Sequence, residues 1–167
     1  NNTPDMEAFL YAVENSRHTL CYNGDICSVE DYRTWRQQME EKRKCAFMQE
    51  SGQQTDPEDT GSLVSHLMLG RGVLKNPGLI GELTGHAPIT KDQFHAFHDD
   101  ILKGYLDVMS GERNTLFRMK ELWFYQKPYF DNADKAFKKI RKSRNMAEYE
   151  AAVQEFFAQA VPTERDT

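Results

Sequence analysis

Two short glycine turns, Asn23-Gly24-Asp25 and Gly70-Arg71-Gly72, carry the residue types best suited to chemistry in this chain. Each turn closes an apolar, strand-like run, HTLCY before the first and LVSHLML before the second. Glycine lets the backbone approach a ligand without a Cβ, so consecutive N–H groups can converge on an anion. Either turn alone is more often an ordinary strand-to-helix turn. Together they favour a phosphate-binding site.

The distribution of charge points to a second kind of site. The 167-residue chain has a formal net charge of −5, yet residues 113–144 hold ten basic and three acidic side chains. That segment therefore carries +7 and the rest of the chain −12. Basic charge segregated within an acidic chain is typical of a surface that binds a polyanion, and a merely solvated helix face is the alternative.

The first half of the chain alternates helical and strand-like patterns. Thr3 is predicted to cap a helix with Pro4 at its first position, and Ser28 with Asp31 resembles a capping box that opens a second helix. Residues 18–22 and 63–69 read as buried strands. From Glu40 to Ser62 the pattern dissolves into charged and polar residues, which predicts that the second helix ends and a long exposed loop follows.

Beyond a short linker over residues 84–89, no strand-like run appears and the pattern predicts four helices. Thr90 and Gln93 form a capping box that opens the first of these helices, and Gly111 ends that helix. The remaining helices are predicted around residues 116–127, 132–142 and 147–160. Four consecutive helices with apolar stripes and short connections predict a small bundle.

The order helix, strand, helix, strand, helix implies a parallel sheet with helical crossovers, but two such strands cannot bury themselves. In an eight-stranded (β/α) barrel, phosphate binds at the loops after strands seven and eight. The predicted fold class is therefore α/β followed by all-α. Residues 1–84 would form the C-terminal portion of a TIM barrel, and residues 85–167 a four-helix bundle domain.

Four segments carry a family resemblance. YNGDI at 22–26, LGRGVLKNPGLI at 69–80, RMKELWFYQKPYF at 118–130 and KAFKKIRKSRNMAEYEAAV at 135–153 together resemble the tRNA-dihydrouridine synthases. That family joins a flavin-dependent barrel to a C-terminal helical domain that helps to hold tRNA. The GRG motif followed closely by NP is the most specific part of this likeness.

The resemblance implies an FMN-dependent oxidoreductase that reduces uridine in tRNA, with NADPH as the reductant. It implies that the FMN phosphate and ribityl chain contact five residues: Asn23, Gly24, Asp25, Gly70 and Arg71. The family's N-terminal barrel half, with its catalytic cysteine, has no counterpart in this sequence. No catalytic residue is therefore assigned, the missing half is an expected partner, and the chain alone is expected to be inactive.

The basic helical segment is expected to contact tRNA phosphates, with salt-dependent rather than sequence-specific binding. The candidate residues are Arg118, Lys120, Lys138, Lys139, Arg141, Lys142 and Arg144. Trp123, Phe124 and Tyr125 could stack on bases, but at helical spacing they are expected to belong to the core.

Other site types find little support in the sequence. Three cysteines without CxxC spacing indicate neither a disulfide framework nor a zinc site, and His95 and His98 lack a clear third metal ligand. No apolar stretch approaches the length of a membrane span and the N-terminus shows no signal pattern, so a cytoplasmic location is expected. Two other functions stay open: a non-catalytic RNA-binding helical module, and another FMN-dependent barrel oxidoreductase.

Overall fold

The computed structural model describes residues 4–50 and 64–163, which are mostly helical with a few short strands. Their contacts divide the chain into two compact units, Asn1–Gly72 and Val73–Thr167, which are described separately below. Within the described ranges, no helix has both the length and the apolar character that crossing a bilayer demands.

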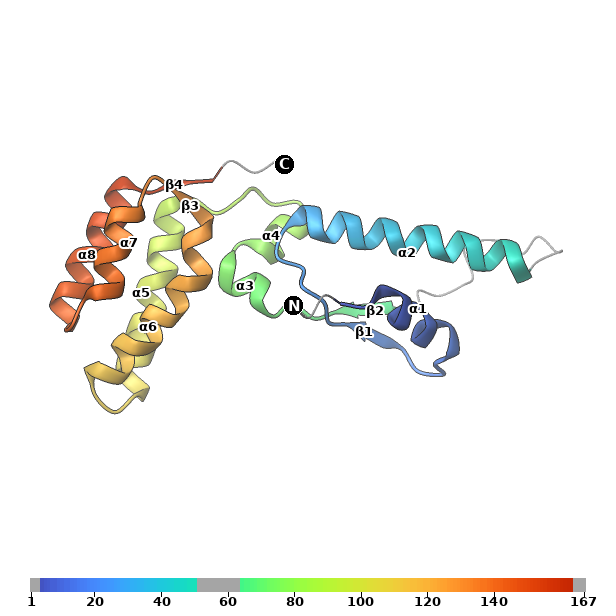
Figure 1. Ribbon diagram of the computed structural model, residues 1–167, viewed down its shortest axis with the longest axis horizontal. Helices are drawn as coiled ribbons and strands as arrows, with labels where there is room; N and C mark the ends of the chain where they lie inside the picture. The colour runs from blue at the N-terminus through green and yellow to red at the C-terminus, as the bar shows by residue number, and fades with distance from the viewer. Residues whose placement is uncertain (1–3, 51–63, 164–167) are drawn as a thin grey trace. The chain divides into compact units, whose positions relative to one another are not determined.

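The first unit contains α1 (Met6–Asn15), β1 (Leu20–Tyr22), α2 (Val29–Glu50), β2 (Val64–Leu67) and the start of α3 (Arg71–Lys75) (Figure 1). The predicted parallel pairing of the two strands is confirmed, with Tyr22 opposite Leu67. The Met68 N–H continues the ladder by donating to the Tyr22 carbonyl at 2.8 Å. Both strands therefore end at the same edge of the sheet.

The N-terminal cap of α1 differs from the prediction. Asp5 is the cap, and its carboxylate accepts from the Ala8 N–H at 3.0 Å, whereas Thr3 lies outside the described residues. Aspartate is as good a cap as threonine, and its side chain reaches the free N–H groups of the first turn. At the start of α2, half of the predicted capping box is present, since the Ser28 hydroxyl accepts from the Asp31 N–H at 3.0 Å. The Asp31 carboxylate accepts from the Cys27 N–H at 2.9 Å, one residue before the predicted donor.

The prediction that the second helix ends near Glu40 is wrong, because α2 continues to Glu50. Residues 40–50 read EEKRKCAFMQE, which is dominated by strong helix formers. Arg36 pairs with Glu40 at 3.1 Å and Gln37 bonds Glu41 at 2.8 Å, both at i,i+4 spacing. A helix supported in this way needs no apolar stripe, so hydrophobic periodicity misses it. The rest of the predicted loop, from residue 51, lies outside the described residues.

An aromatic cluster joins the elements of the first unit. The Tyr22 ring is buried, meets the edge of Phe9 at a centroid distance of 4.9 Å and stacks on Trp35 at 5.2 Å. These three rings come from β1, α1 and α2 respectively. The cluster therefore fixes the end of β1, from which the first glycine turn departs.

The second unit is a helical bundle with a small closing ladder. It contains α4 (Leu79–Leu83), α5 (Lys91–Val108), α6 (Glu112–Gln126), η1 (Lys127–Tyr129), β3 (Phe130–Asp131), α7 (Asp134–Lys142), α8 (Met146–Gln159) and β4 (Val161–Pro162). The four predicted bundle helices are confirmed as α5 to α8. The expectation of no strand after the linker is wrong, because β3 and β4 pair antiparallel. Two-residue strands are too short to show an alternating pattern.

Local signals and packing agree in this bundle. The predicted capping box is present, with the Thr90 N–H donating to Gln93 at 2.8 Å and the Gln93 N–H donating to Thr90 at 3.2 Å. Gly111 immediately precedes α6 with φ of +86°, a conformation that favours glycine. The core draws on all four helices and is built around large buried rings and aliphatic groups, including Phe94, Met119, Trp123, Phe130, Ile140, Tyr149 and Phe156.

A buried chain of hydrogen bonds runs through this core. The Trp123 Nε1–H donates to the Tyr149 hydroxyl at 2.8 Å, which leaves that hydroxyl to donate to His98 Nε2 at 2.7 Å. His98 Nδ1 then donates to Asp99 at 3.0 Å. The Asp99 carboxylate can only accept, so His98 carries its proton on Nδ1, and the neutral Nδ1–H tautomer lets Nε2 accept from the Tyr149 hydroxyl. Burial lowers the pKa of His98, and the hydrogen bond that His98 donates to Asp99 opposes that shift only in part.

We expect the free energy of unfolding to fall as the pH drops below 6.5, the ordinary pKa of histidine. The unfolded chain then binds a proton that the folded chain resists, since the folded pKa is lowered, and the loss continues until the pH passes the folded value. Urea unfolding across this range measures it. His98→Gln should flatten the dependence and His86→Gln, at an exposed position, should not; equal curves for the two variants would contradict the assignment.

Candidate functional site

The two glycine turns that the sequence singles out lie together in the first unit. Because β1 and β2 are parallel, their carboxyl ends are neighbours and the turns leave from the same edge. The turns are also joined directly: Arg71 Nε donates to Asp25 Oδ1 at 3.1 Å, and Arg71 Nη2 pairs with Asp25 Oδ2. Arg71 and Asp25, 46 positions apart in the sequence, thus form one bidentate ion pair.

Gly24 has a structural reason to be glycine. A Cβ at this position would lie 2.2 Å from the Tyr22 hydroxyl, and the Tyr22 ring is held by its aromatic neighbours. The Ile26 N–H donates to the Gly24 carbonyl at 2.9 Å, which makes the turn tight. Burial, and then the nearby charge of Asp25, raise the pKa of Tyr22. Packing alone therefore accounts for Gly24.

Gly70 has no such reason. It is exposed, its φ is not in the left-handed region, and a Cβ would meet nothing within 4 Å. Neither packing nor backbone conformation requires glycine here. The absence of a side chain leaves the backbone of this turn open to a ligand, which is the property that a phosphate-binding turn needs.

The chemistry at this edge combines one cation with several hydrogen-bonding groups. The side chains of Arg71 and Asp25 are 58% and 46% exposed, so both are accessible to a ligand. Asn23 is also exposed. A guanidinium beside open backbone suits a phosphate group, whereas a carboxylate accepts hydrogen bonds from hydroxyl groups. The set fits a molecule that carries both a phosphate and hydroxyls.

In the second unit, three of the seven basic candidates already have partners. Arg118 pairs with Glu121 at 2.8 Å and Lys139 with Glu155 at 2.6 Å. The Lys120 ammonium donates to the Ser143 carbonyl at the end of α7. Burial lowers the pKa of Lys120, and a cation at that position also suits the negative end of the α7 dipole.

The other four basic candidates form a group defined here as the α7 cation set: Lys138, Arg141, Lys142 and Arg144. All four are exposed, and none forms an ion pair with any residue that the structure describes. Arg141 and Lys142 lie in the last turn of α7, Lys138 lies just before that turn, and Arg144 lies in the connection to α8. A compact run of unpaired cations is the charge pattern that a nucleic-acid backbone selects.

The three consecutive aromatic residues of α6 do not share one environment. Trp123 is fully buried and Tyr125 is partly buried, but Phe124 is 58% exposed, so the expectation that all three belong to the core is wrong for Phe124. The helical period explains the difference, since the buried positions Met119, Trp123 and Gln126 follow one stripe. Phe124 lies seven residues after Phe117, which is also exposed, on another face of the helix.

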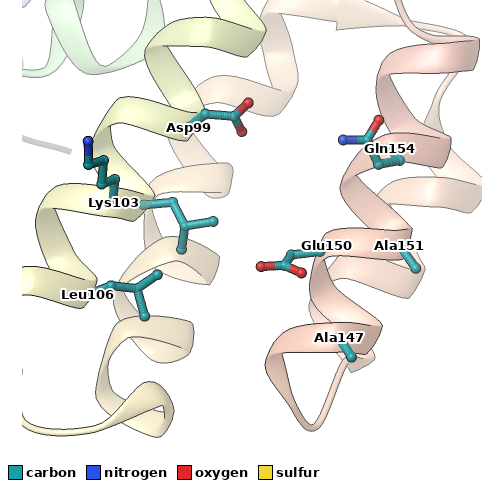
Figure 2. A pocket seen from close by; sticks show the side chains of 8 residues that line it. Asp99, Lys103, Leu106, Ala147, Glu150, Ala151 and Gln154 are labelled. Atoms are coloured by element: carbon teal, nitrogen blue, oxygen red, sulfur yellow. The ribbon is translucent and has the colours of Figure 1, made fainter.

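A groove of about 550 Å³ lies between α5 and α8. Leu102, Leu106, Ala147 and Ala151 supply its apolar lining. Figure 2 shows the carboxylates of Asp99 and Glu150 projecting into it from opposite sides. Lys103 also lines the groove, but the two carboxylates outnumber this cation and disfavour a polyanion, unlike the α7 cation set.

Comparisons with protein-family models, curated proteins and solved structures gave no match to this chain. Within the ranges 4–50 and 64–163, no three His, Cys, Asp or Glu side chains are grouped so as to hold a metal ion. Cys21 and Cys27 are free thiols.

The two glycines should respond differently to alanine. Gly24→Ala should lower the free energy of unfolding by about 1–3 kcal/mol, because the new methyl group must displace the packed Tyr22 ring. Gly70→Ala should change it by less than about 1 kcal/mol, because it meets open space and restricts the unfolded chain. Urea unfolding followed by circular dichroism measures both. Equal destabilisation would show that Gly70 is also fixed by packing.

Proposed function

We propose that this chain is the C-terminal part of a flavin-dependent tRNA-dihydrouridine synthase, an enzyme that reduces uridine in tRNA to 5,6-dihydrouridine with NADPH as the reductant. In this proposal residues 1–84 complete an FMN-binding TIM barrel, and residues 85–167 form the tRNA-binding helical domain. The observation that carries it is the Asp25–Arg71 pair, which joins the two predicted phosphate turns at the carboxyl ends of neighbouring parallel strands.

The residues at this edge fit the phosphate and ribityl end of FMN. The open backbone at Gly70 suits the phosphate, and the Asp25 carboxylate suits ribityl hydroxyls. A guanidinium has five N–H donors, so Arg71 can bind a phosphate while its Nε and Nη2 stay on Asp25. Asn23 and Gly24 would border the ligand from the first turn. When bound, the flavin supplies the hydride-transfer chemistry, and the role of these residues is to fix its position.

The barrel part of the proposal also rests on the sheet. A parallel sheet of two strands cannot cover both of its faces or satisfy both of its edges, whereas closed barrels solve both problems. Since β1 and β2 pair only with each other among the described residues, we propose that an N-terminal barrel half of the same protein supplies the remaining strands. The catalytic residues would come from that half, so the isolated chain would be inactive.

The α7 cation set supports the RNA part of the proposal. Its four exposed cations lack competing ion pairs among the described residues, so binding a phosphate backbone breaks no existing pair. Such contacts position RNA without reading its sequence. Drawing the target uridine out of its base stack costs a few kcal/mol of free energy. Contacts between the protein and other parts of the RNA can offset that cost.

A second candidate function is a non-catalytic RNA-binding module. The observation that favours it is that the second unit has a complete apolar core of its own, whereas the sheet of the first unit is small. Under this alternative the bundle binds RNA and the strands serve only as support. Flavin binding separates the two candidates.

The flavin test uses the chain expressed together with the sequence encoded before Asn1. We expect FMN to copurify, and Arg71→Ala to weaken its binding by about tenfold, because a charge-assisted hydrogen bond to phosphate is lost. Flavin absorbance after titration gives the affinity. Arg33→Ala, an exposed arginine on α2, is the matched control and should bind normally. RNA binding without any flavin would favour the non-catalytic module.

The RNA test uses this chain with unmodified tRNA in filter binding at several salt concentrations. Lys138→Ala with Lys142→Ala should weaken binding and lower the slope of log K against log salt by about 1 for each phosphate contact removed. Lys91→Ala with Lys103→Ala removes the same charge from α5 and should have little effect. Identical salt slopes for the two double variants would reject α7 as the RNA surface.

A further inference from the structure

We propose that Phe124 is a stacking platform for an unpaired RNA base, and that Arg141 holds the ring and the neighbouring phosphate. This inference rests on the proposed function of the second unit as an RNA-binding domain. It goes further by assigning one aromatic contact, on a different element from the cations, to a specific part of the ligand.

The Phe124 ring is held by two groups from α7. The Arg141 guanidinium lies over the ring, 5.4 Å from its centroid, and the Phe137 ring meets it nearly perpendicularly at 6.4 Å. Despite these contacts, 58% of Phe124 remains exposed. The ring is thus oriented by its neighbours while a large part of its surface stays accessible to a ligand.

Planarity and charge identify the chemistry of that ligand. An aromatic ring beside a guanidinium offers stacking to any nucleobase, since every base has a π-face. The same guanidinium can donate two hydrogen bonds to a phosphate. Lys138 lies one turn before Arg141 on α7 and Lys142 directly after it, so further cations accompany the aromatic group along the helix. Single-stranded RNA offers unpaired bases for the aromatic ring and phosphates for these cations.

An apolar protein partner fits this surface less well. Such a partner would leave the cations of α7 desolvated without acceptors, which is costly. The exposed aromatic ring lies beside charged groups rather than within a wide apolar patch, unlike the centre of a stable protein interface. We therefore assign the site to RNA, and the experiment below includes the protein alternative.

The chain offers a matched control in Phe117. It lies on α6 seven residues before Phe124 and is 69% exposed. In the part of the chain that the structure describes, Phe117 has no aromatic partner and no cation over its ring. The nearest basic residue in sequence, Arg118, already pairs with Glu121. Phe117→Leu therefore removes a similar exposed ring without removing the proposed platform.

The experiment compares Phe124→Leu and Phe117→Leu in the full chain. The probe is a short single-stranded RNA that carries 2-aminopurine, whose fluorescence falls when the base stacks. We expect wild type and Phe117→Leu to quench the probe and to bind it equally. Phe124→Leu should bind about tenfold more weakly with little quenching, and its salt slope should be unchanged because no charge is lost. Thermal unfolding of both variants checks that the bundle is intact.

A further variant separates stacking from charge. Arg141→Lys keeps the positive charge but loses the planar guanidinium, so it should weaken quenching while leaving the salt slope close to that of wild type. Equal binding and quenching by the two phenylalanine variants would overturn the inference. So would a chain whose self-association, measured by sedimentation, depends on Phe124 while RNA binding does not. If wild type binds neither this probe nor tRNA, the proposed RNA-binding function itself fails.

Discussion

The parallel pairing of β1 with β2 is the constraint on which the first candidate site depends. Two parallel strands must end at the same edge, so turns that lie far apart in the sequence become neighbours as soon as the strands pair. The Asp25–Arg71 pair then joins the turns, but both side chains are about half exposed, and such a pair contributes less than about 1 kcal/mol. The strands therefore position the site, and the ion pair provides its chemistry rather than its stability.

In the second unit, a packed core with a buried hydrogen-bond network positions the candidate RNA-binding residues. Its core surrounds a directional chain of hydrogen bonds through Trp123, Tyr149 and His98, in which each buried donor has an acceptor. A satisfied buried network is specific, since any shift between α5, α6 and α8 would leave a polar group without a partner. Because α7 packs closely against α8, the surface residues of α6 and α7 stand on a fixed frame. A ligand that binds there meets side chains whose backbone is already ordered, and so loses less entropy on binding.

Features set by neighbouring residues, such as helix caps, can be predicted from the sequence. Features that depend on ion pairs or on tertiary packing cannot be predicted in this way. The capping box of Thr90 and Gln93 joins two residues three positions apart in the first turn of α5, so the sequence alone is sufficient to predict it. The extension of α2 to Glu50 depends on pairs such as Arg36–Glu40, which an apolar period does not register. Three consecutive aromatic residues in a bundle favour the core for all of them, whereas a strict period of 3.6 places Phe124 on the face of Phe117. The Asp25–Arg71 contact could be anticipated only as a meeting of turns, because the direction of a side chain depends on tertiary packing.

The seven basic candidates differ in what binding a phosphate would require of them. Lys120 is engaged by the carbonyl that ends α7, so moving it to a phosphate would leave that carbonyl without its donor. Lys139 holds Glu155, and this contact lowers the pKa of the Glu155 carboxyl, so a phosphate there would compete with an existing anion. Arg118 faces the same competition from Glu121. No member of the α7 cation set forms an ion pair among the described residues, and the charge of Asp134 acts on Lys138 without such a pair. The Arg141 guanidinium in addition lies over the Phe124 ring. By charge alone, all seven basic residues are equally good candidates for binding RNA phosphates. Their existing partners distinguish them, and we expect the RNA contacts to lie at the end of α7.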